Sequence, residues 1–189
     1  MTKEIQPTVE PDTEKDYQFT LEYSSRQLKQ YLTACMNPGT RLQPNKVDSL
    51  VQLVMSGPRG TRFNPFIGEI PQAADKVTWT LQDTEPDADD VGEPTLHYIG
   101  FYSLDPDQAS VTTSSYWNDY FDLDKYSVVA PNGCLYQSSA DNTNKVTIGL
   151  RKDRGELLIG YGAVFTINIG RTLYCCRIDP IANIRSGNP

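Results

Sequence analysis

The sequence has no lysine or arginine over a long internal stretch. From Val77 to Asp124 every charged residue is acidic, and this stretch holds 11 of the 24 acidic residues together with both tryptophans, Trp79 and Trp117. The formal net charge of the 189 residues is −7. Clustered negative charge repels phosphate backbones, so we expect no nucleic-acid contact by this domain, whereas cations, basic partners or sugars remain suitable ligands.

Long hydrophobic runs are also missing. No segment approaches the roughly 20 apolar residues that span a bilayer, so we expect no membrane insertion. Residues 1–16 are polar and acidic and lack the basic and apolar segments of a signal peptide. The chain therefore fits either an intracellular protein or a domain excised from a longer chain.

Cysteine patterns that bind metals are absent. Cys35, Cys134, Cys175 and Cys176 form no Cys-x-x-Cys spacing, which disfavours a zinc site or a disulfide framework. In a strand, the two adjacent cysteines would lie on opposite faces, one of them in the core. The acidic loop 83–94 lacks the spacing of an EF-hand, so solvated carboxylates are favoured over a calcium site. We predict no metal and no cofactor.

Catalytic motifs are equally scarce. His97 is the only histidine and no nucleophile motif accompanies it, which favours a structural role over a Ser-His-Asp arrangement. Glu69 is the only acid in an apolar setting. The segment 160–162, Gly-Tyr-Gly, lacks the lysine and third glycine of a phosphate loop and indicates close strand packing or a bulge. We expect no enzyme, and a hydrolase built on His97 or Glu69 is the alternative.

Many short segments alternate apolar and polar residues. Tyr17–Tyr23 and Val77–Gln82 alternate strictly, as half-buried strands do. Further strands are predicted at Ser49–Met55, Thr95–Leu104, Val111–Trp117, Tyr126–Ala130, Cys134–Ser138, Lys145–Arg151, Glu156–Gly160, Ala163–Ile169 and Thr172–Ile178. Residues 45–55 also carry apolar side chains at helical spacing, and we favour a strand there. In the predicted strand Thr95–Leu104, one face would carry Leu96, Tyr98, Gly100, Tyr102 and Leu104. The other face would carry His97, Ile99 and Phe101.

One helix is predicted, from Arg26 to Met36. Ser24 and Ser25 are possible N-caps, apolar residues recur at helical spacing, and the sequence Asn-Pro-Gly at 37–39 ends the pattern. Many short strands with one short helix near the N-terminus indicate a mainly β fold, either an antiparallel β-sandwich or a barrel-like domain.

The chain divides into three parts. Residues 1–16 are predicted to be a flexible acidic tail or linker, 17–180 a single β-rich domain, and 181–189 a C-terminal tail. From residue 145 to the end, seven basic residues accompany three acidic ones. A molecule with one acidic and one basic region can associate with itself, head to tail or in antiparallel pairs. The alternative is that these basic residues are solvated strand ends.

The strongest candidate binding site is a cluster of aromatic and polar residues. It consists of Tyr116, Trp117, Asn118, Asp119 and Tyr120. Aromatic rings beside amide and carboxylate groups suit both sugar stacking and protein hot spots. The alternative is that two of these rings belong to the core.

The overall pattern resembles the protruding or spike domain of a small non-enveloped RNA virus capsid protein. The residues that carry this resemblance are the short strands from Tyr126 to Ile178, the turns rich in Tyr, Thr, Ser and Asn, the acidic surface loops and the polar flanks 1–16 and 184–189. The resemblance covers roughly residues 17–180. It implies a β-rich domain on the virion surface that forms a homodimer and attaches to a host receptor.

The first functional hypothesis is therefore a viral capsid surface domain that performs no chemistry and displays loops 83–94 and 105–124 outward. The alternative is a carbohydrate-binding β-sandwich module of cellular or phage origin. In that module Tyr116, Trp117 and Tyr120 would form a stacking platform for a glycan.

Overall fold

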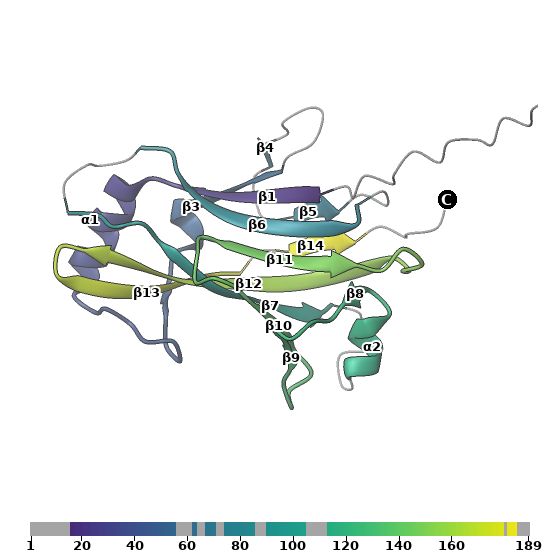
Figure 1. The fold of residues 1–189 in the computed structure, drawn as a ribbon. Coiled ribbons are helices and arrows are strands. Elements are labelled where there is room, and N and C mark those ends of the chain that lie inside the picture. The colour runs from purple at the N-terminus through teal and green to yellow at the C-terminus, as the bar shows by residue number, and fades with distance from the viewer. Residues whose placement is uncertain are drawn as a thin grey trace, which may run out of the picture.

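A computed structural model of the chain describes residues 16–55, 62–63, 67–70, 74–85, 90–104, 113–179 and 181–184. The fold is mainly β, with two sheets packed face to face around one core (Figure 1). Within the described residues the sheets remain open and form no closed barrel. The prediction of a mainly β fold is confirmed, in its sandwich form.

The first sheet, the upper layer in Figure 1, has β1 and β6 at its centre. Its strand order is β4 (Arg62–Phe63), β3 (Val51–Met55), β1 (Asp16–Tyr23), β6 (Lys76–Asp83), β11 (Lys145–Leu150) and β8 (Phe121–Asp122). Successive side chains of a strand point to opposite faces. Phe19 and Leu21 of β1 therefore face the core together with Trp79 and Leu81 of β6, and all four are at most 2% exposed.

The second sheet is built around the 13-residue strand β12. Its strand order is β2 (Asn45–Lys46), β13 (Thr172–Ile178), β12 (Leu157–Ile169), β7 (Thr95–Ser103), β10 (Leu135–Ser138) and β9 (Ser127–Val129). Two more strands, β14 (Ile181–Ile184) and β5 (Ile67–Ile70), extend it, since β14 pairs with both β12 and β5. β14 thus lies within the segment that was predicted as a C-terminal tail.

The strand pairs are of mixed orientation, so the expectation of a purely antiparallel sandwich is wrong. β1 runs parallel to β6, β2 to β13 and β5 to β14, whereas the other pairs are antiparallel. Parallel neighbours require a long connection between them. The chain supplies one between β1 and β6, because α1 (Ser25–Cys35), the 3₁₀ turn η1 (Asp48–Leu50) and several strands intervene.

α1 confirms the predicted helix and begins one residue earlier. Ser24 is the N-cap, and its side chain accepts a hydrogen bond from the backbone N–H of Gln27 at 3.3 Å. The acidic loop adds to this cap, because Asp83 Oδ1 accepts from the N–H of Ser25 at 3.0 Å. Glu85 also accepts from the Ser24 hydroxyl at 3.0 Å. Carboxylates at a helix N-terminus are favoured by the helix dipole, so part of this acidic block is structural.

The segment predicted as a strand at Val111–Trp117 instead contains a helix, α2 (Ser114–Asn118). Thr113 is its N-cap and accepts from the N–H of Tyr116 at 3.3 Å. Residues 111 and 112 lie outside the described residues. The threonine and serine side chains of this segment suit a helix N-cap as well as a strand. The helix is favoured here because it directs Trp117 into the core. There the indole N–H donates to the carbonyl of Gly133 at 2.9 Å.

β7 contains an irregularity that alternation does not predict. Its pairing with β12 shifts register between Val164 and Phe165, which leaves His97 as an extra residue between Leu96 and Tyr98. Leu96 therefore lies in the core, while Tyr98 faces outward. The prediction that these two side chains share a face is wrong, because a β-bulge reverses the alternation beyond it.

The centre of the core is aromatic and joins the two sheets. Trp79 of β6 stacks on Phe19 with ring centroids 5.5 Å apart, and it also contacts Tyr161 of β12 at 5.6 Å. All three residues are 0% exposed. Such buried rings contribute strongly to packing.

None of the helices in the described part of the chain is long and apolar enough to cross a bilayer.

Candidate functional site: the tyrosine face

The outer face of the β12 sheet carries tyrosines that lie over glycines. We call it the tyrosine face and define it by Tyr98, Gly100 and Tyr102 of β7, Tyr136 of β10, and Leu158, Gly160, Gly162 and Val164 of β12. The alternating pattern of these strands sends their other residues into the core. Two neighbouring strands with glycines in register thus form a shallow floor beneath the rings.

Two of the three glycines, Gly100 and Gly160, provide space for a neighbouring tyrosine ring. A Cβ atom on Gly100 would lie 2.9 Å from Cε1 of Tyr136, and a Cβ on Gly160 would overlap the ring of Tyr102. The ring of Tyr136 also contacts Tyr98 edge to face, with centroids 5.5 Å apart. Glycine is therefore required at these positions for the rings to lie flat on the sheet.

Exposed apolar side chains concentrate on this side of the molecule. Seven large hydrophobic residues are exposed in the described part of the chain, and the four on or beside the tyrosine face are Leu42, Tyr102, Val128 and Leu158. Leu173 of β13 is exposed farther along the same sheet, where it pairs with Asn168 of β12. The other two, Tyr31 and Met36, belong to α1 and its C-cap. Scattered exposed apolar residues are ordinary, whereas their collection on one sheet face makes that face the candidate interaction surface.

A loop after α1 is fixed at one edge of the tyrosine face. The N–H of Cys175 donates to the carbonyl of Pro38 at 2.8 Å, and the side chain of Asn45 donates to the carbonyl of Cys175 at 3.3 Å. The loop projects Arg41 and Leu42, the latter 94% exposed. A hollow of about 240 Å³ lies between this loop and the rings of the face.

Two arginines give the edge of the tyrosine face a positive character. Arg177 lies beside Asp179, with Nε and Oδ2 3.6 Å apart. Burial raises the pKa of Tyr98, and the charges of Arg41 and Arg177 oppose this rise. The pKa of His97 is lowered by burial and by the charge of Arg41. At neutral pH the hydroxyl of Tyr98 and the imidazole of His97 are therefore neutral.

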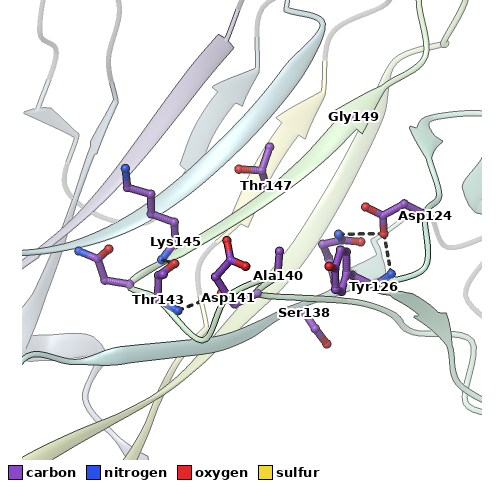
Figure 2. A pocket seen from close by; sticks show the side chains of 12 residues that line it. Asp124, Tyr126, Ser138, Ala140, Asp141, Thr143, Lys145, Thr147 and Gly149 are labelled. Carbon is purple, nitrogen blue, oxygen red and sulfur yellow. Dashed lines mark hydrogen bonds between the residues drawn. The ribbon is translucent and has the colours of Figure 1, made fainter.

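A second hollow lies between the two sheets at their open edge. It has a volume of about 690 Å³ and is bounded by polar residues of β10, β11 and the connections around them (Figure 2). Asp124 Oδ1 accepts hydrogen bonds from the N–H of Tyr126, at 2.8 Å, and from the amide of Gln137, at 3.3 Å. Figure 2 shows Lys145 extending away from Asp124. Because Asp124 already accepts these internal hydrogen bonds, the hollow offers few uncommitted polar groups to a ligand.

Of the two residues considered for catalysis, only His97 has a described side chain. Its Nε2 lies 2.9 Å from the Thr166 hydroxyl. The side chain of Glu69 lies outside the described residues. The four cysteines are unpaired, and burial raises the pKa of Cys176 to about 12. Such a thiol is a poor nucleophile at neutral pH. Among the described residues, no group of three or more His, Cys, Asp or Glu side chains is placed to hold a metal ion.

The predicted binding cluster is divided between core and surface. Trp117 is 0% exposed, and Tyr116 and Tyr120 are partly buried and pack against the core. The Tyr116 hydroxyl donates to Ser103 at 2.9 Å. Asn118 and Asp119 remain exposed. The fully buried indole of Trp117 therefore cannot present a face for stacking, and the alternative of core rings holds for this residue.

The tyrosine face was missed from the sequence, although two signals for it were present. Tyr98-x-x-x-Tyr102 around Gly100, and Gly160-x-Gly162, place small and aromatic residues at strand spacing. Only the register of β7 and β12 shows that these two patterns lie side by side.

Comparisons with known proteins inform the fold. No family model matches the sequence, and no curated protein matches it significantly. A similar solved structure is described as an inclusion body protein (PixA) from Burkholderia cenocepacia J2315. The TM-score is 0.53 at 8% sequence identity, and the likeness covers 91% of this chain and 96% of that chain. At this identity the likeness shows the fold alone.

This finding corrects the hypotheses drawn from the sequence. The similar structure is that of a bacterial inclusion body protein and not of a viral capsid protein. It points away from a virion-surface spike that attaches to a host receptor, and equally from a carbohydrate-binding module. The pattern of short strands and polar turns misled the interpretation because many β-sandwiches share it. The chain has the fold of a bacterial inclusion body protein.

Proposed function

We propose that this chain is a non-enzymatic protein that associates with copies of itself through the tyrosine face. The observation that carries this proposal is the collection of exposed apolar side chains on one outer sheet face. Tyr102 is 39% exposed, Leu158 45% and Val128 59%. Burying apolar surface of this kind against a second copy contributes about 25 cal/mol for each Å² removed from water. Aromatic side chains are enriched at the centres of such interfaces.

The sheet edges support association through faces. The outermost described strands β2, β4, β8 and β9 are two or three residues long, and β5 has four. Short edge strands offer few unpaired backbone groups for another chain to extend the sheet. The tyrosine rings that lie over Gly100 and Gly160 give this face a flat aromatic surface. A contact between faces is therefore favoured over the addition of strands.

The similar fold suggests the product of this association. The solved structure that shares the fold is described as an inclusion body protein, and a protein in a dense body must contact further copies of itself. Two identical faces that meet form a closed dimer, whereas contacts between different surfaces extend without closing. We propose that dimers formed at the tyrosine face are the units from which a larger body grows.

The test is light scattering after size exclusion over a hundredfold range of concentration. Leu158→Glu places a charge on the tyrosine face, near the beginning of β12. Its matched control is Thr80→Glu, which places the same charge on the outer face of the other sheet, opposite Lys145. The wild type and Thr80→Glu are expected to form dimers or larger species as the concentration rises. Leu158→Glu is expected to remain monomeric up to a concentration at least tenfold higher.

Two results would overturn the proposal. One is a wild type that stays monomeric across the whole range. The other is a Leu158→Glu variant that associates as well as the wild type does. Circular dichroism of both variants excludes misfolding as the cause of any difference.

A further inference from the structure

A tight turn presents Arg41 and Leu42 beside the tyrosine face. The N–H of Thr40 donates to the carbonyl of Gln43 at 3.1 Å, and the N–H of Gln43 donates back to the carbonyl of Thr40 at 3.1 Å. Reciprocal bonds of this kind close a two-residue turn, with Arg41 and Leu42 at its tip. Both tip residues are exposed, so their side chains are accessible to a second molecule.

The turn is anchored to the sheet through the residues on either side of it. Gly39 has a φ of +70°, a left-handed conformation that glycine adopts without strain. A Cβ atom at this position would lie 2.9 Å from the carbonyl oxygen of Cys175 in β13, so glycine also allows the close approach to that strand. The side chain of Asn45 donates to the carbonyl of Asn37 at 3.0 Å and closes the loop. The position of the turn is therefore set before any ligand arrives.

The hollow between this turn and the tyrosine rings carries an uncompensated positive charge. We call it the arginine hollow; its volume is about 240 Å³, and its charged lining residues are Arg41, Arg177 and Asp179. Asp179 Oδ2 lies 3.6 Å from Nε of Arg177 and 3.7 Å from Nζ of Lys46, and this lysine is also 3.3 Å from Asp48. The Arg41 guanidinium makes no hydrogen bond or ion pair with the described residues. Arg41 is thus the cation that the local carboxylates leave unpaired.

Tyrosines and glycines form the rest of the arginine hollow. Tyr98, Tyr102 and Tyr136 line it, and Gly100 and Gly162 contribute backbone without side chains. A phenol hydroxyl can donate a hydrogen bond to an anion. An arginine presents its N–H donors as a planar fork that matches the two oxygens of a carboxylate. The hollow therefore combines donors of the kind that a carboxylate requires.

We propose that the arginine hollow binds a carboxylate of a second copy of this chain. The inference rests on the proposed function, because it names the group that one copy presents to the tyrosine face of another. Charge complementarity favours a second copy, since residues 77–124 hold 11 acidic residues and no basic one. Asp90, Glu93 and Asp119 of this block are exposed. Arg41 would donate paired hydrogen bonds to such a carboxylate.

The probe is sodium acetate, added at constant ionic strength and followed by the amide NMR signals of Gly100 and Gly162 in the hollow. The sample is the Leu158→Glu variant, whose substitution lies outside the hollow and is designed to keep copies apart. Acetamide, which has a similar shape and no charge, is the matched control. Acetate is expected to shift these signals in a saturable way, and acetamide several-fold more weakly. Inorganic phosphate in parallel tests a site for another anion.

Variants assign the binding of acetate to a named group. Arg41→Gln is expected to weaken it about fivefold, the loss of one paired but exposed guanidinium contact. Arg41→Lys keeps the charge without the planar fork and should lie between this variant and the parent protein. Arg171→Gln changes an exposed arginine in the turn between β12 and β13 and should leave binding unchanged. Absence of saturable shifts, equal binding by Arg41→Gln, or tighter binding of phosphate would overturn the proposal.

Light scattering then tests whether the carboxylate belongs to a second copy. Arg41→Glu is expected to weaken association about tenfold, because like charges would meet at the contact, whereas Arg171→Glu should leave it unchanged. Saturating acetate should likewise reduce association of the wild type. Association that neither Arg41→Glu nor acetate reduces would overturn the assignment to a second copy. The acetate titration gives its result whether or not the protein associates, so failure of this inference and failure of the proposed function are distinguishable.

Discussion

The two outer faces of the sandwich differ although their strands are built by the same alternation. The first sheet presents Thr20, Thr78, Thr80 and Thr147, with Lys145 and Gln82 beside them. Thr78 and Thr147 satisfy each other through their hydroxyls, which are 2.9 Å apart. We call this the threonine face. The tyrosine face presents rings over glycines and exposed leucines.

Under the proposed function, one outer face of the sandwich stays in contact with water while the other meets a second copy. Threonine is β-branched and suits a pleated surface, and its hydroxyl keeps that surface hydrated. Tyrosine presents a large apolar area with few rotatable bonds and a polar tip, so it buries surface at low entropic cost. The exposed sides of the two sheets thus differ in chemical character, while their inner sides share one core.

The largest loss of stability is expected in the core that the two sheets share. Trp79→Ala removes an indole that is 0% exposed and stacks on Phe19. Truncation of a buried aromatic costs about 3–5 kcal/mol. Urea unfolding should show this loss of stability as one cooperative transition seen by both sheets. Two separate transitions would contradict a single core.

The next effect separates the faces. Gly160→Ala adds a methyl group where the Tyr102 ring lies, and this exposed ring can swing away with little loss of stability. We expect self-association to weaken about tenfold, since rigid aromatic anchors dominate interfaces. Thr20→Ala on the threonine face should leave association unchanged. Sedimentation velocity measures both, and equal association of the two variants would contradict the assigned role of the tyrosine face.

A smaller effect is expected away from both faces. Ser24→Ala removes the N-cap of α1, including the contact with the N–H of Gln27. The free energy of unfolding should fall by about 1 kcal/mol. Association should not change at concentrations where the variant is folded. A loss of association in this variant would show that α1 contributes to the contact.

The smallest effect is a pH dependence on the tyrosine face. The pKa of His97 is lowered by burial and by Arg41, so protonation favours the unfolded chain. His97 therefore contributes stability above its unfolded pKa of about 6.5, and this contribution is lost as pH falls through that value toward the lower folded pKa. Thermal unfolding of His97→Gln should show a shallower decline between pH 7 and 5 than the wild type. Identical pH profiles would contradict this assignment.

Local patterns predicted much of the fold. Strict alternation identified β1 and β6, and a capped amphipathic segment identified α1 to within one residue. The glycines at 160 and 162 were interpreted as close packing, and Gly160 does lie against a tyrosine ring. They were also taken as a break between two strands, whereas β12 continues through them. Neighbouring strands supply the hydrogen bonds that hold glycine in an extended conformation, and these partners are invisible in the local sequence.

Long-range contacts account for what the sequence could not provide. The strands β2, β4 and β8 have two residues each, too few for any periodic signal. The burial of Trp117, one residue of the predicted binding cluster, has a related cause. Trp117 and Tyr102 are both aromatic residues in polar surroundings, but only the packing of α2 on the core buries the first, and only the register of β7 with β12 exposes the second.

The central claim is that copies meet through the tyrosine face, and hydroxyl-radical footprinting of two matched tyrosines tests it most directly. Tyr102 on the face and Tyr31 on α1 are 39% and 40% exposed, so they should be modified at similar rates in the monomer. As concentration rises and the protein associates, the account predicts that Tyr102 becomes protected while Tyr31 does not. Association that protects Tyr31 and leaves Tyr102 reactive would contradict it.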